Sequence, residues 1–489
     1  MSSTTRTTRK VAGGAVGFLI VMEFGSGLLQ GWFPPLLSRI GSDFGVEAAA
    51  LNWVMVIYLL MTVAFVPIIG KLGDLYGHKK MLLITVCLVA AGSLLVAFAP
   101  SFTWLLVGRA LQAPLGAFLP LEFAIVRSRD EGSAGRSIGK LVGALTLGGA
   151  LGAMFSGVLL SAFDDLTLVL LAPALFLVLC IPVVAWLVPE SSTRTAGTID
   201  WAGAVLLTAG LLSALLGISN AATWGWDSAA TWGTIIGGLV LLVLWVRVEG
   251  RVAYPLIDLK VLTGTGIGLP IVAAAFFGAQ MFGSQTAGSL FIMTDPNTYG
   301  FGLGLGSSAI GLLFLVLALM TFIGTTQADR IGSKIGARAA IIAGSVLSAL
   351  SFGGMILMAD NATAFMVSMA IGAFGNGLIL GLLPAIVVRK SPADSVAIAS
   401  ALYNTTRTAS GSVSGAVFAL VMSSALVTVT VDGTSSTVSA DSTYVAVWII
   451  CAVLSLGVAL LALRFRDTPT PAGAPAESTP VAAAAAEGE

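Results

Sequence analysis

The chain has 489 residues, of which 57% are hydrophobic and 10% are charged, and its mean hydropathy is +0.98. An ordinary soluble domain is about 25% charged, so this composition excludes such a domain and indicates an all-α protein that crosses a membrane many times. The formal net charge is zero, which gives no sign of a nucleic-acid partner, and we expect none.

Fourteen long apolar runs follow one another along the chain, and a membrane-spanning helix needs about 20 such residues. The first run follows the basic and polar residues 1–10 and has no small-residue cleavage site, so we expect a retained span and not a signal peptide. We expect spans at residues 11–36, 49–70, 81–99, 103–126, 137–162, 166–188, 201–220, 230–248, 266–292, 308–327, 339–358, 363–388, 396–427 and 443–464.

The basic residues support an even number of spans. Almost all of the 24 Lys and Arg residues fall in loops on one side of this plan, whereas Arg39 alone falls on the other side, and Arg109 and Arg407 lie within spans. Because positively charged loops stay in the cytoplasm, we expect cytoplasmic termini in a multi-pass protein of the inner (plasma) membrane. We expect a monomer surrounded by the lipid bilayer.

Two parts of the chain repeat. The run 148–156 matches the run 411–419, and each follows a similar Ala-Ile-Val turn that ends near Arg127 or Arg389. Two related halves are typical of alternating-access transporters, and the Gly-x3-Gly pairs suit close packing at the seam between them. We expect an N-terminal six-helix bundle at 1–188, a linker with two extra transmembrane helices at 189–262, a C-terminal six-helix bundle at 263–467 and a disordered cytoplasmic tail at 468–489.

A short polar stretch, residues 70–80, separates two apolar runs. Its glycines allow a tight reversal, and Asp74 is its one acid among several lysines. The stretch is either a positively charged turn that fixes topology or a latch, in which the Asp74 carboxylate holds a neighbouring helix end in one conformation and releases it in another. We expect His78 only to add to the basic character of this loop.

Charged side chains inside spans cost roughly 2.5–3.5 kcal/mol each, so they are functional candidates by default. Glu23 and Arg109 lie at depths at which they could meet, either as a proton carrier and its modulator or as a static ion pair. We expect Glu122 to form a structural pair with Arg136 or Lys140.

Neutral polar, aromatic and Met residues within the spans suit an adaptable, largely apolar pocket, although each one singly also fits a packing or lipid-facing role. Arg407 is either a substrate or anion contact or a cation that packs against helix carbonyls. The candidates for the substrate pocket are Gln30, Tyr58, Gln112, Gln280, Asn404 and Arg407.

The sequence offers no catalytic or metal-binding pattern. His78 is its one histidine, and Cys87, Cys180 and Cys451 lie far apart in apolar runs, so neither metal spacing nor a disulfide framework follows from them. No G-x4-G-K-[S/T] loop for ATP occurs. We expect no enzyme activity, no metal and no cofactor, with the proton gradient as the energy source.

The chain resembles the major facilitator superfamily over nearly its whole length, and its fourteen-span plan resembles the drug:proton antiporter branch. Residues 70–80 resemble motif A of that family, with Gly70, Asp74, Gly77 and Lys79 on the key positions. The resemblance implies a major facilitator fold: two six-helix bundles, here with two inserted central helices.

Two further motifs carry the resemblance. The stretch around Arg109 and Gln112 resembles motif B of span four, whose arginine is implicated in proton coupling, with Ala113 where glycine is usual. The family tends to carry an acid in span one, and Glu23 is the residue that can fill that role. The antiporter motif of span five, motif C, resembles the stretch with Gly148, Gly152 and Gly157, in which Ala153 replaces the usual proline.

The resemblance implies a proton-coupled secondary transporter that exports amphipathic small molecules by alternating access, as multidrug efflux proteins do. Glu23 would carry the proton, Arg109 would modulate it and Asp74 would be the gate latch. One alternative is an exporter or flippase for a specific metabolite or lipid. An alternative of another class is a membrane scaffold or sensor that transports nothing.

Overall fold

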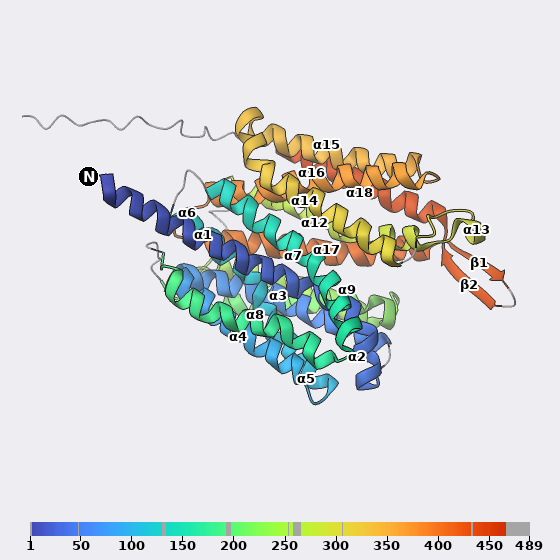
Figure 1. Ribbon diagram of the computed structural model, residues 1–489, viewed down its shortest axis with the longest axis horizontal. Helices are drawn as coiled ribbons and strands as arrows, with labels where there is room; N and C mark the ends of the chain where they lie inside the picture. Colours follow the sequence, from blue (N-terminus) through green and yellow to red (C-terminus); the bar gives the residue numbers. More distant parts are fainter. Residues whose placement is uncertain are drawn as a thin grey trace, which may run out of the picture.

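The computed structural model describes residues 2–46, 48–129, 134–191, 197–252, 254–257, 266–305, 307–431 and 434–465, and most of them are helical (Figure 1). The first part holds α1 (Ser2–Gly31), the 3-10 helix η1 (Pro34–Leu36), α2 (Leu37–Phe44), α3 (Ala48–Tyr76), α4 (His78–Ala97), α5 (Phe102–Gln112), the 3-10 helix η2 (Ala113–Ala117), α6 (Phe118–Arg129), α7 (Ala134–Phe163), α8 (Leu166–Leu187), α9 (Trp201–Trp224) and α10 (Ala229–Glu249). The second part holds α12 (Gly268–Met293), α13 (Pro296–Tyr299), α14 (Ser307–Ile335), α15 (Ala337–Leu357), α16 (Ala362–Lys390), α17 (Val396–Ser423), β1 (Leu426–Val431), β2 (Thr434–Ser439) and α18 (Asp441–Ala462).

Each expected span coincides, over most of its length, with one helix or with consecutive helical segments. The expected span 103–126 is interrupted at η2 around Pro114, because proline cannot donate the backbone hydrogen bond of an α-helix. Twelve segments of the described chain are long and apolar enough to cross a membrane, and α12 and α17 fall outside that set. The chain is thus a mostly helical membrane protein, whereas the count of fourteen spans and the cytoplasmic termini stay predictions.

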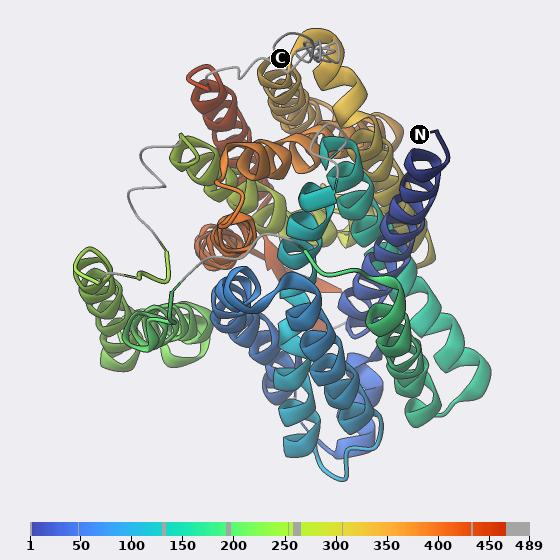
Figure 2. The same ribbon diagram turned by 90° about the vertical axis from the view of Figure 1, so that its left-hand side faces the viewer.

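The helices form two bundles that lie side by side (Figure 2). In the first bundle α1 packs against α7 and α4 packs against α8, and in the second α12 packs against α17 while α16 packs against α14 and α15. The bundles meet along two seams, α3 with α17 and α7 with α14. The expected domain limit at 188 lies next to the end of α8, whereas the limit at 262 and the tail at 468–489 lie outside the described residues, so the domain plan stays a prediction.

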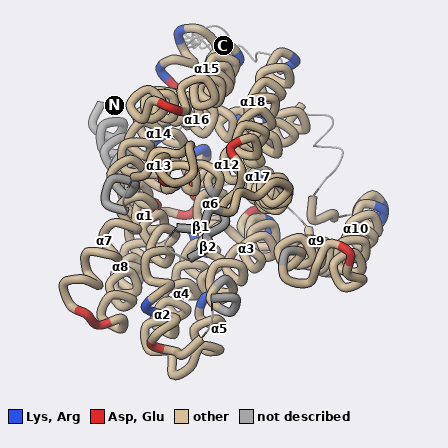
Figure 3. Tube along the Cα trace, turned by 90° about the vertical axis from the view of Figure 1, so that its right-hand side faces the viewer, with Lys and Arg blue, Asp and Glu red and all other residues tan. Residues whose placement is uncertain are grey.

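Helices α9 and α10 pack mainly against each other and stand beside the bundles (Figure 3). α9 contacts both α3 and α17, so this inserted pair covers one of the two seams from outside. Asp200 caps α9 by accepting a hydrogen bond from the Gly203 N–H at 2.9 Å, and Ser228 caps α10. Such caps satisfy backbone N–H groups that a helix start leaves free.

The polar stretch 70–80 is not the loop that the sequence suggested. α3 continues to Tyr76 and α4 begins at His78, so the reversal takes place at Gly77 alone. Gly77 has a φ of 110°, a conformation that glycine adopts without the steric cost of a side chain. Gly336, with a φ of 91°, makes the same reversal between α14 and α15. Asp74 therefore lies on the last turn of a helix, which fixes its direction.

A two-stranded hairpin follows α17. β1 and β2 pair antiparallel, with Leu426 opposite Ser439, and lie at the end of the molecule away from the start of α1 (Figure 1). The expected span 396–427 extends into this hairpin, which the sequence analysis does not predict. Its signal is the alternation of Val and Thr at 427–431, a period of two that is typical of strands. The opposite end, where α3 meets α4, is called the latch end below.

Candidate functional site: a latch between the bundles and two buried polar groups

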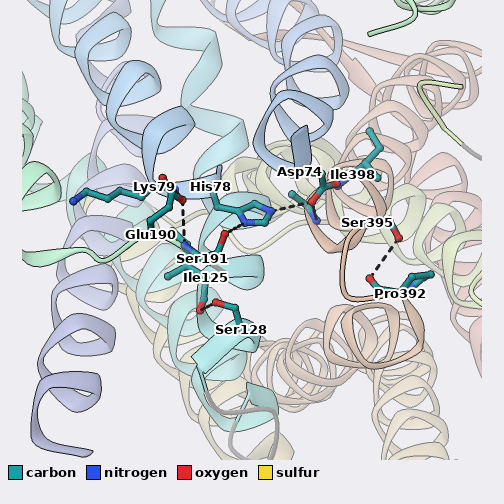
Figure 4. A network of polar contacts seen from close by, with 11 residues as sticks. Asp74, His78, Lys79, Ile125, Ser128, Glu190, Ser191, Pro392, Ser395 and Ile398 are labelled. Carbon is teal, nitrogen blue, oxygen red and sulfur yellow. Dashed lines mark hydrogen bonds and ion pairs between the residues drawn. The ribbon is translucent and has the colours of Figure 1, made fainter. Parts of the chain in front are cut away.

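The latch residue Asp74 joins the first bundle to the second. Its carboxylate is 1% exposed and accepts hydrogen bonds from the backbone N–H groups of Ala397 (3.2 Å) and Ile398 (2.9 Å) in the first turn of α17 (Figure 4). Those N–H groups have no partner within the helix, and the positive end of the helix dipole favours an anion there. Gly70 brings α3 close enough, because a Cβ at this position would lie 2.9 Å from the Ala401 Cβ.

His78 is part of this latch, contrary to the expectation that it only adds basic charge. It is buried, its Nε2 hydrogen bonds to Asp74 Oδ1 at 2.9 Å, and its Nδ1 lies 2.5 Å from the Ser191 Oγ (Figure 4). With Nε2 as the donor to the carboxylate, Nδ1 accepts from the Ser191 hydroxyl. The neighbouring Glu190 caps α4 by accepting from the Lys79 N–H at 3.0 Å. Sequence reasoning missed His78, Glu190 and Ser191 because it treated residues 70–80 as a loop and residues from 189 on as linker.

Further contacts cross the seams at the latch end. Asp329 of α14 lies 3.6 Å from the Arg136 Nε in the first turns of α7. Arg127, at the end of α6, donates to the backbone carbonyls of Val388 and, at 2.6 Å, of Ser391. Both seams are therefore held together by polar contacts at this end.

Glu23 and Glu122 form a pair inside the first bundle. Both are fully buried, and their carboxyl groups, from α1 and α6, lie close enough to interact, with the Ser26 hydroxyl beside Glu23. Neither Glu122 oxygen has a hydrogen-bond partner in the described part of the chain. The expected pairing of Glu122 with Arg136 or Lys140 is wrong, because Arg136 points to the seam and Lys140 is exposed. Two facing carboxyl groups can hold one proton between them.

Arg109 is buried in the same bundle but does not meet Glu23. Its Nε donates to the Val54 carbonyl at 2.9 Å, its Nη1 donates to the Gln112 Oε1 at 2.6 Å, and its guanidinium lies 4.6 Å from the centre of the Tyr58 ring. Arg109 takes part in none of the ion pairs found among the described residues. Tyr58 and Gln112, two of the expected pocket residues, lie beside this guanidinium.

A cavity of about 230 Å³ lies where α12, α14, α15 and α16 of the second bundle meet, and Thr146 of α7 in the first bundle also lines it. Asn376 fixes its polar side by accepting hydrogen bonds from Gln280 (2.8 Å) and Ser348 (2.7 Å). Gln280 is thus the one expected pocket residue beside this cavity, whereas Gln30 is exposed and bonds Ser26 at 3.3 Å. The apolar lining of the cavity includes Met281, Phe314, Phe352, Met355 and Met369.

Asn404 and Arg407, the other two expected pocket residues, lie at the seam between the bundles. The Asn404 side-chain N–H donates to the Gly116 carbonyl of the first bundle at 3.3 Å, and the Arg407 Nη2 donates to the Asn404 Oδ1 at 3.1 Å. Both residues line a second, much smaller cavity between α6, α7, α16 and α17.

The glycines of span five pack helices within one bundle. A Cβ at Gly148 would overlap the Phe24 carbonyl of α1, and a Cβ at Gly152 would overlap the Leu28 carbonyl. Gly157 is less crowded, since its nearest neighbour would be Pro35 at 3.9 Å. The Gly148 and Gly152 pair therefore packs α7 against α1 within the first bundle, whereas α7 itself lies on the seam with α14, where the sequence places it.

Comparison with known proteins decides the family. The model of the Major Facilitator Superfamily matches residues 19–415 and 271–487. The chain belongs to this superfamily. A cephamycin export protein, CmcT of Amycolatopsis lactamdurans, is 29% identical over 94% of this chain and 92% of that protein. The multidrug efflux pump LfrA of Mycolicibacterium smegmatis is 28% identical over 76% of this chain and 72% of that protein.

The fold also matches a solved member of the superfamily. The human organic anion transporter MFSD10 (TETRAN) aligns with a TM-score of 0.64 over 94% of this chain and 100% of that chain, at 15% identity. At this identity the likeness shows the fold alone. Family and fold together establish a membrane transporter, which also agrees with the expectation that the protein is not an enzyme.

Proposed function

We propose that this protein is a proton-coupled exporter of amphipathic small molecules, of the multidrug efflux type, which works by alternating access in the inner membrane as a monomer with cytoplasmic termini. Membership of the superfamily and the relatives named as exporters support transport and export. The observation that carries the proton coupling is the buried pair of Glu23 and Glu122, which no basic side chain neutralises within the described ion pairs.

The pair works as a proton site because two facing carboxylates repel each other where water does not screen them. The pair therefore retains one proton until water or a cation reaches it, and its two steps of proton binding belong to the pair and not to either residue. Arg109 is the proposed modulator, since a positive charge favours the ionised pair more strongly as it comes nearer. Movement of α5, which carries Arg109, relative to α1 and α6 would change the distance between the guanidinium and the two carboxyl groups.

The latch is the proposed gate, and the latch end is the cytoplasmic end. Asp74 caps α17 in the conformation closed to the cytoplasm, with Gly70 providing close approach, Gly77 the reversal and Glu190 a second cap, which accepts from the Lys79 N–H of α4. Separation of α3 from α17 would break the two hydrogen bonds that Asp74 accepts from α17 and open the protein to the cytoplasm.

The cavity in the second bundle is the proposed place for the apolar part of a substrate. Met and Phe side chains surround it, and thioethers adapt to differently shaped ligands. The energy is sufficient: a proton that crosses about 150 mV releases about 3.5 kcal/mol, which sustains a substrate gradient of about 300-fold if fully coupled.

Proton flux in everted vesicles tests the proposal. Energised vesicles receive lipophilic cationic, neutral and anionic compounds while the internal pH is followed for the wild type, Glu23→Gln and Glu122→Gln. We expect compound-induced proton efflux in the wild type and none in either variant, at unchanged protein levels. Glu249→Gln is the matched control, since Glu249 is also buried but lies at the end of α10. Efflux that persists in both pair variants would show that the proton uses another site.

A further inference from the structure

The face of α17 that looks into the small seam cavity carries three buried polar groups without partners. Ser400 Oγ, Tyr403 Oη and Arg407 Nε have no hydrogen-bond partner in the described part of the chain, and their residues are 1%, 3% and 9% exposed. The spacing of three and then four residues places them on one side of a helix. All three line a cavity of about 10 Å³, roughly the room of one water.

The charge of this cluster is positive and unbalanced. A guanidinium has five N–H donors, and Arg407 uses one of its nitrogens to donate to the neutral Asn404. The ion pairs found among the described residues do not include Arg407, while the Phe282 and Tyr403 rings lie 5.6 and 5.9 Å from its guanidinium carbon. The Tyr403 hydroxyl is near the guanidinium but outside hydrogen-bond geometry.

We propose that Ser400, Tyr403 and Arg407 form a subsite for the anionic group of an organic substrate. A carboxylate or sulfonate would accept two parallel hydrogen bonds from the guanidinium and one each from the two hydroxyls, so that every unpartnered donor gains a partner. The remaining lining includes Leu119, Phe123 and Leu380, which favours an anion with an apolar body over inorganic phosphate. This inference rests on the proposed function and names the class of its substrate.

The place of the subsite explains when it would bind. Arg407 lies 11 residues after the start of α17, about 16 Å from the latch end. The contact of Asp74 with α17 is nearer that end, at the first turn of the helix. The Asn404 side chain lines the cavity and bridges to Gly116 of the other bundle. Opening of the latch would separate α17 from α3 and α6, break this bridge and enlarge the cavity towards the cytoplasm, the side from which an exporter loads.

Calorimetric titration of the purified protein tests the subsite with two probes of nearly equal shape, 2-naphthoate and the uncharged 2-naphthylmethanol. We expect the wild type to bind 2-naphthoate more tightly than the alcohol, and inorganic phosphate not measurably. Arg407→Gln should weaken 2-naphthoate binding by about 10- to 100-fold, the range of lost hydrogen bonds to charged groups, and change alcohol binding less than 2-fold.

Two matched variants complete the design. Tyr403→Phe removes one hydroxyl and should weaken 2-naphthoate binding several-fold, whereas Arg247→Gln removes an exposed arginine at the end of α10 and should change nothing. The inference is overturned if the wild type does not prefer 2-naphthoate, if Arg407→Gln leaves that preference intact, or if it weakens both probes equally, as a purely structural arginine would. Intact proton efflux with no anion preference would refute the subsite alone, and anion preference without compound-induced proton efflux would refute the proton coupling alone.

Discussion

The substitution Asp74→Asn tests the latch most sharply, because it keeps the shape of the side chain and removes its charge. The two carboxylate oxygens accept from two backbone N–H groups of α17. An asparagine retains one acceptor oxygen and turns an NH2 group towards the other N–H. The closed conformation therefore loses one hydrogen bond to a charged group, worth about 1.5–3 kcal/mol, and the favourable interaction of the charge with the helix dipole, worth about 0.3–1 kcal/mol.

The open conformation loses little, since an exposed Asp74 is hydrated. The balance then shifts by about 2–4 kcal/mol, which is at least about 30-fold in the ratio of open to closed molecules. Pulsed electron-spin distance measurements between spin labels at Lys80 and Ser333, both exposed near the latch end, would report that ratio in a background without the three native cysteines.

Asp165→Asn is the matched control for this experiment. The Asp165 carboxylate also accepts from two backbone N–H groups, those of Thr167 and Leu168, but it caps α8 inside the first bundle and bridges no seam. We expect a larger long-distance fraction for Asp74→Asn and an unchanged fraction for Asp165→Asn. Equal distance distributions in the wild type and Asp74→Asn would show that the Asp74 charge does not hold the closed conformation.

Two further substitutions probe the seams and the packing of span five. Arg136→Gln should raise the ratio of open to closed molecules by a few-fold at most. The Arg136 contact with Asp329 is long and Arg136 is 59% exposed, which limits such an ion pair to about 1 kcal/mol. The same spin-label distances measure this ratio, and a shift as large as that of Asp74→Asn would contradict a minor role for Arg136. Gly152→Leu should lower the melting temperature by several degrees, because its side chain would meet the Leu28 carbonyl, whereas Gly157→Leu, in more open surroundings, should melt close to the wild type.

Much of the architecture was predictable because membrane spans are long and their apolar runs are hard to mistake. The sequence also indicates that Asp74 contacts another helix, because a lone acid in a short glycine-rich reversal has few partners other than a neighbouring helix end. Its real partners, the N–H groups of Ala397 and Ile398, lie more than 320 residues away, and no local pattern specifies them.

The sequence does not predict which of the buried charged side chains pair with each other. Depth in the membrane suggested that Glu23 could meet Arg109, but depth says nothing about the rotation of each helix. That rotation turns Glu122 towards Glu23 and turns Arg109 towards Val54 and Gln112. It follows from the packing of α1, α5 and α6 as a whole, which a single sequence does not reveal.

In the proposed mechanism, Glu23 and Glu122 share a proton that leaves when substrate binds. Purified protein in weakly buffered solution, with a pH indicator and a compound that elicits proton efflux in vesicles, measures this directly. We expect the release of about one proton per bound substrate in the wild type and none in Glu23→Gln and Glu122→Gln, with binding itself retained in at least one variant. Binding without proton release in the wild type, or undiminished release in both variants, would contradict it.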